Sequence, residues 1–309
     1  MEKPMDVLEQ FPVRKSKKQK QRFRDAVIPY LQGLGYPVQV EKGSCGSRNI
    51  VIGNPNSASY LITAHYDTCA ELPVPNFITP CSLPGFLGYQ ILLVGLFFLI
   101  AAAASAAAAL LFGSEFAGLM GFELTLVLIC VLVISGPANP SCTNDNTSGV
   151  ISVLEIAKDL PENQRNKVCF ILFDLEEAGL IGSGSYAKMH KKEISNQLNL
   201  NLDCVGDGDD IVFFPTGKLK KAPQKLQVLN SCCGWYGDKH IWIRKKGFSV
   251  YPSDQVNFPY GVGICALRKK FKTLYLGRIH TRRDTVLEIT NVNLLRAAII
   301  SMVSCDAAK

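Results

Sequence analysis

A long uncharged interval constrains this chain more than any other feature. Glu71 and Glu115 bracket it, and its apolar part runs from Phe86 to Phe112. Roughly 27 helical residues at about 1.5 Å each reach about 40 Å, against a hydrocarbon core of about 30 Å. Soluble cores rarely need so long an uncharged stretch with an alanine-rich run such as 101–109. The interval therefore predicts a helix that crosses a membrane with some tilt.

A second apolar run, Leu124 to Ile134, extends back through Glu123 to Phe116 and completes a predicted transmembrane hairpin. A carboxylate at mid-bilayer costs about 2.5–3.5 kcal/mol on insertion scales. We therefore expect Glu123 near the far interface, with 116–122 as a re-entrant or interfacial link and a short second span. A protonated or functional Glu123 is one alternative, and a pair of buried core helices is the alternative to the whole hairpin.

The hairpin divides the chain into an insertion, residues 85–135, and a domain formed by residues 1–84 and 136–309. Because a hairpin returns to its starting side, both parts of the domain lie on one face of the membrane. The N-terminus is polar and charged, so we expect no signal peptide. The 11 cysteines lack Cys-x-x-Cys spacing, which is typical of a reducing compartment. We expect an integral membrane protein whose domain faces the cytoplasm.

The positive charge is concentrated near the N-terminus. Lys and Arg number 33 against 26 Asp and Glu, a net charge of +7, and much of the excess lies in residues 14–24. We expect this run to contact anionic lipid headgroups, and the solvated face of a first helix is the alternative. It carries no aromatic interleaving and no nucleic-acid-binding motif, so we expect no nucleic-acid partner.

The rest of the chain alternates apolar strand-like runs with amphipathic helical ones. This alternation predicts an α/β fold with a mixed, mostly parallel sheet covered by helices on both faces, in three layers. Strands are expected at 37–41, 48–52, 60–64, 168–173, 197–202, 211–214, 240–244 and 273–276, and helices at 14–33, 150–157, 179–191, 223–232 and 291–305.

Two adjacent carboxylates, Glu176 and Glu177, follow the apolar run 168–173 and precede a glycine-rich turn. They therefore lie at the C-terminal end of a strand, the edge where α/β sheets bind ligands. Neighbouring side chains on an extended backbone point in opposite directions, so one Glu can ligate a metal while the other addresses a water. A solvated pair of acids in a loop is the alternative.

Other candidate ligands sit in equivalent places. His65 and Asp67 end one strand, where Asp67 can hold the imidazole while the other ring nitrogen faces a metal. Asp203 also follows a strand. Asp145 precedes a helix whose N-cap could be Asp145 or Asn146. With Glu177 and His280, a mixed histidine and carboxylate set suits paired zinc ions bridged by one Asp. The predicted ligands are His65, Asp145, Glu177, Asp203 and His280.

The order of these motifs closely resembles the M28 family of zinc aminopeptidases, over essentially the whole chain outside the hairpin. The matching residues are His65-x-Asp67, Asp145-Asn146-x-Ser148-Gly149, Glu176-Glu177-x-Gly179-Leu180-x-Gly182-Ser183, Asn201-Leu202-Asp203 and His280-Thr281-x-x-Asp284-Thr285. The resemblance implies a zinc-exopeptidase-like fold and two zinc ions per chain. It also implies that Asp145 bridges the ions, Glu177 and His280 hold one, His65 and Asp203 hold the other, Glu176 is the general base and acid, and Asp67 supports His65.

The implied function is a membrane-anchored aminopeptidase that removes N-terminal residues from peptides. Two features depart from the family pattern, namely Gln255 and the inserted hairpin. Gln255 stands where the family usually has His after Ser-Asp, so we expect an altered outer part of the site or substrate pocket. Tyr251 could donate a hydrogen bond to the oxyanion or simply pack as an aromatic. The hairpin lies between His65 and Asp145, which predicts a site mouth close to the bilayer and membrane-proximal or apolar peptide substrates.

Other functions remain compatible with the sequence. A glutaminyl cyclase resembles the same motifs but uses one zinc. A hydrolase of another amide and a non-catalytic membrane receptor or scaffold are further alternatives. The receptor would be expected to lack ligands, and none is missing here.

Overall fold

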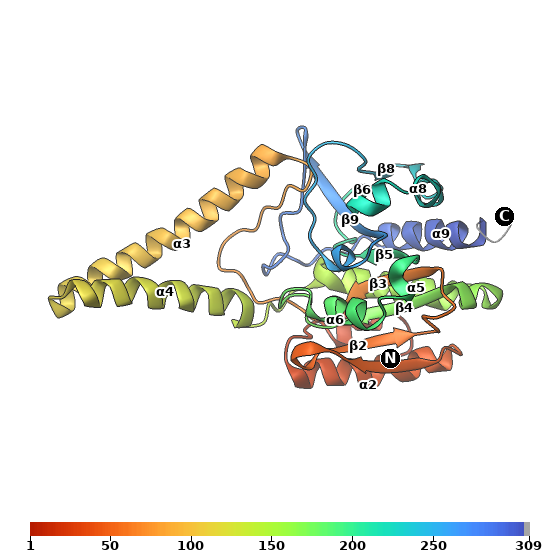
Figure 1. The fold of residues 1–309 in the computed structure, drawn as a ribbon, viewed down its shortest axis with the longest axis horizontal. Coiled ribbons are helices and arrows are strands. Elements are labelled where there is room, and N and C mark those ends of the chain that lie inside the picture. Colours follow the sequence, from red (N-terminus) through yellow and green to blue (C-terminus); the bar gives the residue numbers. More distant parts are fainter. Residues whose placement is uncertain (306–309) are drawn as a thin grey trace.

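A computed structural model describes residues 1–305 as an α/β domain from which a helical hairpin projects (Figure 1). Within these residues, ten strands form one sheet. They are β1 Val38–Lys42, β2 Arg48–Ile52, β3 Tyr60–His65, β4 Val168–Phe173, β5 Leu198–Leu202, β6 Asp210–Pro215, β7 Gly234–Tyr236, β8 Lys239–Ile243, β9 Gly261–Lys270 and β10 Thr273–Tyr275.

The strand order is β1-β2-β4-β3-β5-β9-β6-β8-β7, with β10 paired to β9. Strands β4, β3, β5 and β9 are mutually parallel in the centre, β6 and β8 form another parallel pair, and the remaining pairs are antiparallel. The predicted mixed sheet is therefore present, with a parallel centre. Because β3, β4 and β5 point the same way, their C-terminal ends meet at one edge.

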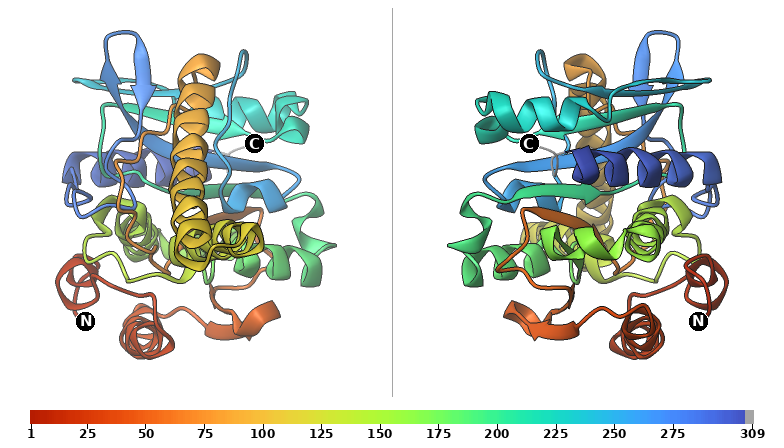
Figure 2. Two further views of the ribbon diagram at one scale, coloured as in Figure 1. Left: turned by 90° about the vertical axis from the view of Figure 1, so that its left-hand side faces the viewer. Right: turned by 90° about the vertical axis from the view of Figure 1, so that its right-hand side faces the viewer.

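Helices cover both faces of the sheet (Figure 2). Side chains on β3 alternate between the faces, so Ile62 joins the apolar core beneath α5 and α9, whereas Leu61 joins a second core with Tyr186 of α6. The predicted three-layer arrangement is confirmed. Outside the hairpin the α-helices are α1 Asp6–Gln10, α2 Lys17–Gly33, α5 Gly149–Asp159, α6 Ile181–Met189, α7 Gly217–Lys220, α8 Pro223–Asn230 and α9 Ile289–Cys305.

One central strand, β9, was absent from the sequence-based prediction, as was the short strand β7. Gly261 and Gly263 begin β9, and glycine weakens the strand pattern of a sequence. Both glycines are needed for close packing: a Cβ at Gly263 would lie 2.7 Å from the Gln255 amide carbon. Gly261 and Gly263 therefore weaken the strand pattern in the sequence, and they also let the loop that carries Gln255 approach β9.

Part of the basic N-terminal run is internal, so the alternative of a wholly solvated helix face is wrong. Arg14 is fully buried. Its Nε donates to the Tyr66 carbonyl at 2.6 Å and its Nη2 to the Thr147 hydroxyl at 3.0 Å. Lys20 forms a buried ion pair with Asp174 at 2.6 Å. These contacts fasten the N-terminal segment to the edge of the sheet that carries the candidate ligands.

The hairpin consists of α3 Leu83–Phe112 and α4 Glu115–Ser135, two helices long and apolar enough to cross a bilayer. Only 6% of the most apolar part of each is buried, and both project from the domain (Figure 1). They are not buried core helices. Helix α4 is also continuous from Glu115, so the expected link at 116–122 and short second span are wrong. Glu123 lies within this helix and is exposed.

Small residues hold the two helices together near the tip of the hairpin. A Cβ at Gly118 would lie 3.2 Å from the Ala109 Cβ, and one at Gly121 would lie 3.0 Å from the Ala108 Cβ. Such small-residue contacts let helices approach closely in a membrane. Towards the domain the helices diverge (Figure 1) and, with the loop 71–74, enclose an apolar cavity of about 400 Å³.

Candidate metal centre

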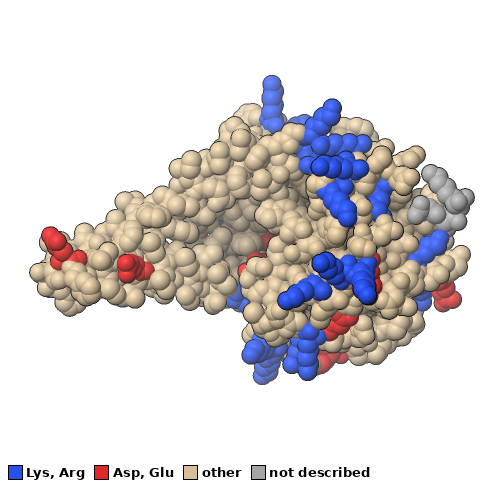
Figure 3. Space-filling model, in the orientation of Figure 1, with Lys and Arg blue, Asp and Glu red and all other residues tan. Residues whose placement is uncertain are grey.

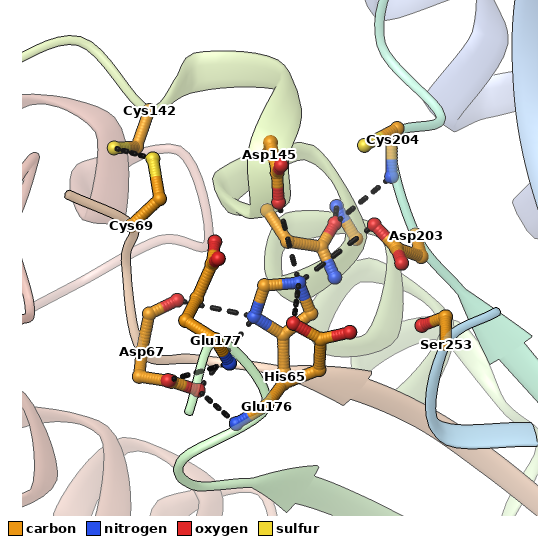
Figure 4. A network of polar contacts seen from close by, with 12 residues as sticks. His65, Asp67, Cys69, Cys142, Asp145, Glu176, Glu177, Asp203, Cys204 and Ser253 are labelled. Carbon is orange, nitrogen blue, oxygen red and sulfur yellow. Dashed lines mark hydrogen bonds and ion pairs between the residues drawn. The ribbon is translucent and has the colours of Figure 1, made fainter. Parts of the chain in front are cut away.

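The predicted ligands converge at the C-terminal edge of the parallel strands. His65 is the last residue of β3, Glu177 follows β4 and Asp203 follows β5. Asp145 lies in the turn Thr143–Ser148 before α5, and His280 lies in the loop that precedes α9. Figure 4 shows the carboxylates of Asp145, Glu176 and Asp203 around the His65 ring. Parallel pairing of adjacent strands explains why residues so far apart in sequence meet.

Asp145 lies between the two histidines. Its Oδ1 is 3.3 Å from His65 Nε2, and its Oδ2 is 3.0 Å from His280 Nε2. Asp203 Oδ1 lies 3.7 Å from His65 Nε2, and Glu177 Oε2 lies 3.6 Å from His280 Nε2. The five predicted ligands thus form two His and carboxylate groups that share one central aspartate.

Two further aspartates support this cluster from behind. Asp67 accepts the backbone N–H groups of Glu176 and Glu177 at 3.1 and 3.2 Å, and its Oδ1 lies 3.6 Å from His65 Nδ1. Asp284 accepts the backbone N–H groups of Asn144 and Asp145 at 2.8 and 2.9 Å. Asp67 therefore holds a ligand from each of two strands, whereas Asp284 holds the turn that carries the central aspartate.

The positioning role of Asp284 was not predicted, although the motif beginning at His280 contained it. Its spacing in sequence gave no indication that it contacts the Asp145 turn. The helix cap is also resolved: Asn146 Oδ1 accepts from Gly149 N at 3.0 Å. Asn146 therefore satisfies the first free N–H of α5, whose N-cap residue is Ser148, and the side chain of Asp145 is left for the metal centre.

Burial and mutual charge shift the pKa values of the cluster. Burial raises the pKa of Glu176 well above its usual range and that of Glu177 to about 8. Burial opposes ionisation of Asp145 too, but hydrogen bonds from His280 and His65 hold its pKa below the ordinary value. Burial acts to lower the pKa of His280, yet Glu177 and Asp145 together raise it to about 10. The cluster holds protons that a cation would displace.

The donor set fits divalent metal ions. Glu177 Oε1 and Asp203 Oδ1 are buried without a hydrogen-bond partner among residues 1–305, an arrangement that costs free energy unless a cation binds there. Ligand atoms of His65, Asp145 and Glu177 lie within 4.8 Å of one another, as do those of His65, Glu176 and Asp203. Histidine and carboxylate ligands suit zinc.

Two cysteines border the same centre and were not predicted. The ligand atoms of Cys69, Glu177 and His280 lie within 4.8 Å of one another, and those of Asp145, Asp203 and Cys204 do likewise. Cys69 Sγ also lies 3.8 Å from Cys142 Sγ (Figure 4). Nothing in their sequence spacing resembled a metal motif, because their closeness arises only from the folded loops.

Tyr251 and Gln255 are joined to the site through the backbone. The Tyr251 hydroxyl donates to the Asp203 carbonyl at 3.0 Å, while its ring forms part of the cavity wall. Gln255 is buried, donates to the Tyr251 carbonyl at 2.6 Å and accepts from Asn201 at 3.2 Å. Gln255 therefore supports Tyr251 and is not among the residues that line the cavity.

The cluster opens into a cavity of about 360 Å³. Its polar lining includes Glu176, Glu177 and Asp203, and its other walls are largely apolar. Phe86 and Gln90, from the first two turns of α3, also line this cavity. The hairpin therefore supplies part of the wall of the candidate site.

Comparison with known proteins identifies the family. The sequence profile of peptidase family M28 matches residues 133–303, more than half of the chain. The chain belongs to peptidase family M28. Aminopeptidase YwaD of Bacillus subtilis (strain 168) is 41% identical over 75 residues. That match spans 23% of this M28 chain and 16% of the relative.

Solved structures share the fold of this M28 chain. Porphyromonas gingivalis glutaminyl cyclase superposes with a TM-score of 0.64 at 16% identity, covering 98% of this chain and 96% of its own. The Legionella pneumophila LapA aminopeptidase superposes with a TM-score of 0.58 at 14% identity, covering 97% of this chain and 68% of its own. At these identities the likeness shows the fold alone, and it includes both aminopeptidases and cyclases.

Replacing Asp67 with Asn tests its support of the cluster. We expect zinc affinity to fall about 10- to 100-fold, because the variant loses one acceptor for the Glu176–Glu177 backbone and the charge beside His65. Competition with a chromophoric chelator measures the affinity. Asp238→Asn, on an exposed residue of the β7–β8 turn, is the matched control. Equal affinities for Asp67→Asn and the control would contradict this role.

The metal-free protein should become less stable as pH rises from about 5 to about 8. The pKa of folded Glu177 is about 8, whereas the unfolded carboxyl releases its proton near 4.5, so the folded state binds more protons over this window. The raised pKa of His280 acts in the same direction above about 6.5. Thermal unfolding of chelator-treated protein should therefore give a falling Tm, restored by zinc most strongly at the upper end. Glu177→Gln should flatten the slope, and a Tm that rises across the window would contradict the assignment.

Proposed function

We propose that the chain is a membrane-anchored, zinc-dependent aminopeptidase that releases N-terminal residues from peptides. The position of Asp145 between His65 and His280 carries the proposal, because each carboxylate oxygen faces a different imidazole at 3.3 and 3.0 Å. A shared aspartate with one further carboxylate on each side suits two ions. His65 and Asp203 would hold one zinc, and Glu177 and His280 the other.

The reaction would depend on proton transfer by Glu176. Bound zinc lowers the pKa of a water and polarises the substrate carbonyl. The carboxylate of Glu176 lines the cavity, with Oε2 4.0 Å from His65 Nε2, and its backbone N–H is held by Asp67. Glu176 would take the proton of the attacking water and return it to the departing amine. Burial raises the pKa of Glu176, which makes its carboxylate a stronger base and favours the first of these two steps.

The chain's other residues would orient the substrate. The carboxylates around the cavity attract a free α-amino group, which favours N-terminal trimming over internal cleavage. Tyr251 would donate to the oxyanion by turning its hydroxyl from the Asp203 carbonyl towards the substrate. The apolar wall at Phe86 would accept an apolar side chain of the peptide.

Membrane anchoring is part of the proposal because of the hairpin. Two exposed apolar helices that project from a folded domain would be a liability in water, and each is long enough to span hydrocarbon. The cavity wall includes the first turns of α3, so the site mouth would lie close to the bilayer surface. Peptides whose N-termini emerge at that surface would be the substrates, with the domain on the cytoplasmic side.

A glutaminyl cyclase is the second candidate, because the P. gingivalis cyclase shares the fold over 98% of this chain. Purified protein should be incubated with a peptide library that includes Gln-initiated peptides. Released free amino acids, with metal near two per chain at full activity, support the aminopeptidase. Loss of ammonia from Gln-initiated peptides, with metal near one, supports the cyclase. No turnover at any metal loading would favour a receptor or scaffold.

Phe86→Ala tests the proposed contribution of the hairpin to substrate choice. We expect kcat/KM for peptides with a large apolar N-terminal residue to fall about tenfold, because an apolar contact in the cavity wall is lost. Peptides with a small N-terminal residue should be affected less. Phe112→Ala, at the exposed far end of the same helix, is the control. Equal effects on both peptide classes would contradict a specific role for Phe86.

A further inference from the structure

The hairpin has no positively charged residues near it in the sequence. No Lys or Arg occurs between Arg48 and Lys158, a stretch that includes both helices and their flanks. Membrane spans are normally oriented by Lys and Arg within about 15–20 residues of their ends. The only charges on the helices are Glu115 and Glu123, both towards the tip. By sequence alone, the hairpin therefore lacks the usual orientation signal.

The fold brings the first basic segment to the end of α4. Lys15 Nζ donates to the Ile134 carbonyl at 2.8 Å, which satisfies one of the unpaired carbonyls at the helix C-terminus. Lys17 and Lys18 follow it at the start of α2 and are exposed. Lys15 therefore lies at the base of the second hairpin helix, and Lys17 and Lys18 are the next exposed basic residues in the same segment.

A second basic segment lies at the start of α3. Arg244 Nη2 donates to the Cys81 carbonyl at 3.4 Å. The Phe248 ring lies 5.8 Å from that of Phe86 in the first turn of the helix. Lys245 and Lys246, between these two contacts, are exposed. This loop therefore presents positive charge beside the base of the first hairpin helix.

A third basic segment lies near the C-terminal end of α4. Arg282 pairs with Glu71 at 2.6 Å, and the Glu71 N–H donates to the Pro137 carbonyl just after α4. Arg283, the next residue, is exposed. Figure 3 shows Lys and Arg side chains on the domain above and below the base of the hairpin, while the hairpin itself carries acidic side chains near its tip. Three segments distant in sequence therefore lie near the ends of the hairpin helices that join the domain.

We propose that these residues form a basic collar that binds anionic lipid headgroups. The collar consists of Lys15, Lys17, Lys18, Arg244, Lys245, Lys246 and Arg283. Each Lys or Arg close to an anionic surface strengthens membrane partition about fivefold, and the cytoplasmic leaflet is the anionic one. The charges that orient the span are therefore supplied by the folded domain rather than by the flanking loops. The collar also fixes Phe86, and with it the cavity mouth, at the level of the headgroups.

The inference rests on the proposed membrane anchoring but not on peptidase activity, and the experiment separates the two. Membranes containing the full chain are first extracted with alkaline carbonate. Release of the protein would refute the anchoring itself. Retained protein is then reconstituted in nanodiscs of phosphatidylcholine with or without phosphatidylglycerol, and backbone hydrogen exchange is measured. We expect phosphatidylglycerol to slow exchange in 12–18, 244–250 and 280–284 by about fivefold.

Charge-removal variants assign the effect to the collar. One variant combines Lys15→Gln, Lys17→Gln and Lys18→Gln, and a second combines Lys245→Gln, Lys246→Gln and Arg283→Gln. Each should lose the lipid-dependent protection of its own segments. The control combines Lys218→Gln, Lys220→Gln and Lys221→Gln, which removes three charges from α7 and its C-cap at the opposite edge of the sheet and should leave the protection unchanged.

Two results would overturn the collar. Exchange in the three segments could be identical in the two lipid mixtures, which would mean that the charges do not meet headgroups. Alternatively, the control variant could lose protection as much as the collar variants do, which would mean that only net charge matters.

Discussion

Glu176→Gln is expected to lower kcat by about 10²- to 10⁴-fold while zinc remains bound. Glu176 lines the cavity and lies 4.0 Å from His65 Nε2, and its backbone is held in place by Asp67. Glutamine keeps the size of the side chain and these backbone contacts but cannot take a proton from water. Steady-state release of N-terminal residues gives kcat, and elemental analysis of the same sample gives the metal content.

The adjacent variant Glu177→Gln is the matched control for this prediction. Glu177 Oε2 lies 3.6 Å from His280 Nε2, so its replacement should lower the metal content as well as turnover. Glu176→Gln should therefore lose turnover and keep its zinc, whereas Glu177→Gln should lose both. If Glu176→Gln also lost one equivalent of zinc, Glu176 would be a ligand rather than the proton carrier.

Asp145→Asn is expected to weaken zinc binding by more than about 100-fold, a larger loss than outer partners of metal sites produce. Both of its oxygens face histidines, and its backbone is fixed by Asp284, so its replacement removes a carboxylate oxygen from each histidine. Loss of this shared carboxylate should remove both ions rather than one. Zinc content after dialysis against a weak chelator, together with turnover, measures the effect.

Asp203→Asn tests whether Asp145 is a ligand of both ions, because Asp203 would be a ligand of only one. Asp203 Oδ1 approaches only the His65 side of the centre, at 3.7 Å. Its replacement should weaken one ion and leave the other, so the metal content should fall towards one per chain. Identical metal contents in Asp145→Asn and Asp203→Asn would argue against the bridging position of Asp145.

Most of the strands were predictable because they are apolar runs that end abruptly in charge or glycine. Strand β4 is buried along its whole length and ends immediately before Asp174. In contrast, β9 begins with Gly261 and Gly263, whose role depends on Gln255 packing against them. Local sequence contains no trace of that contact. The central strand was therefore missed because tertiary packing, and not local propensity, makes it a strand.

The hairpin illustrates a similar limit. Its apolar character and approximate ends were evident, but the cost of placing Glu123 in hydrocarbon favoured a broken second helix in the prediction. In the structure, Ser114 accepts from the Ala117 N–H and begins α4 eight residues earlier than that carboxylate. Gly118 and Gly121 then pack against alanines of α3. Interhelical packing of small residues keeps the helix continuous through a residue that hydropathy alone disfavours.

The sequence by itself determined which side chains could form the metal centre, since His65, Glu177 and Asp203 each follow a strand whose end must lie at one edge of a parallel sheet. Only the tertiary structure decided that Asp145 lies between two histidines, that Asp67 supports two strands at once, and that basic segments surround the hairpin. The physical reason is the separation in sequence over which each kind of interaction acts. Strand formation and apolar runs are encoded by neighbouring residues, whereas charges and hydrogen-bond partners meet across more than a hundred residues only after the chain has folded.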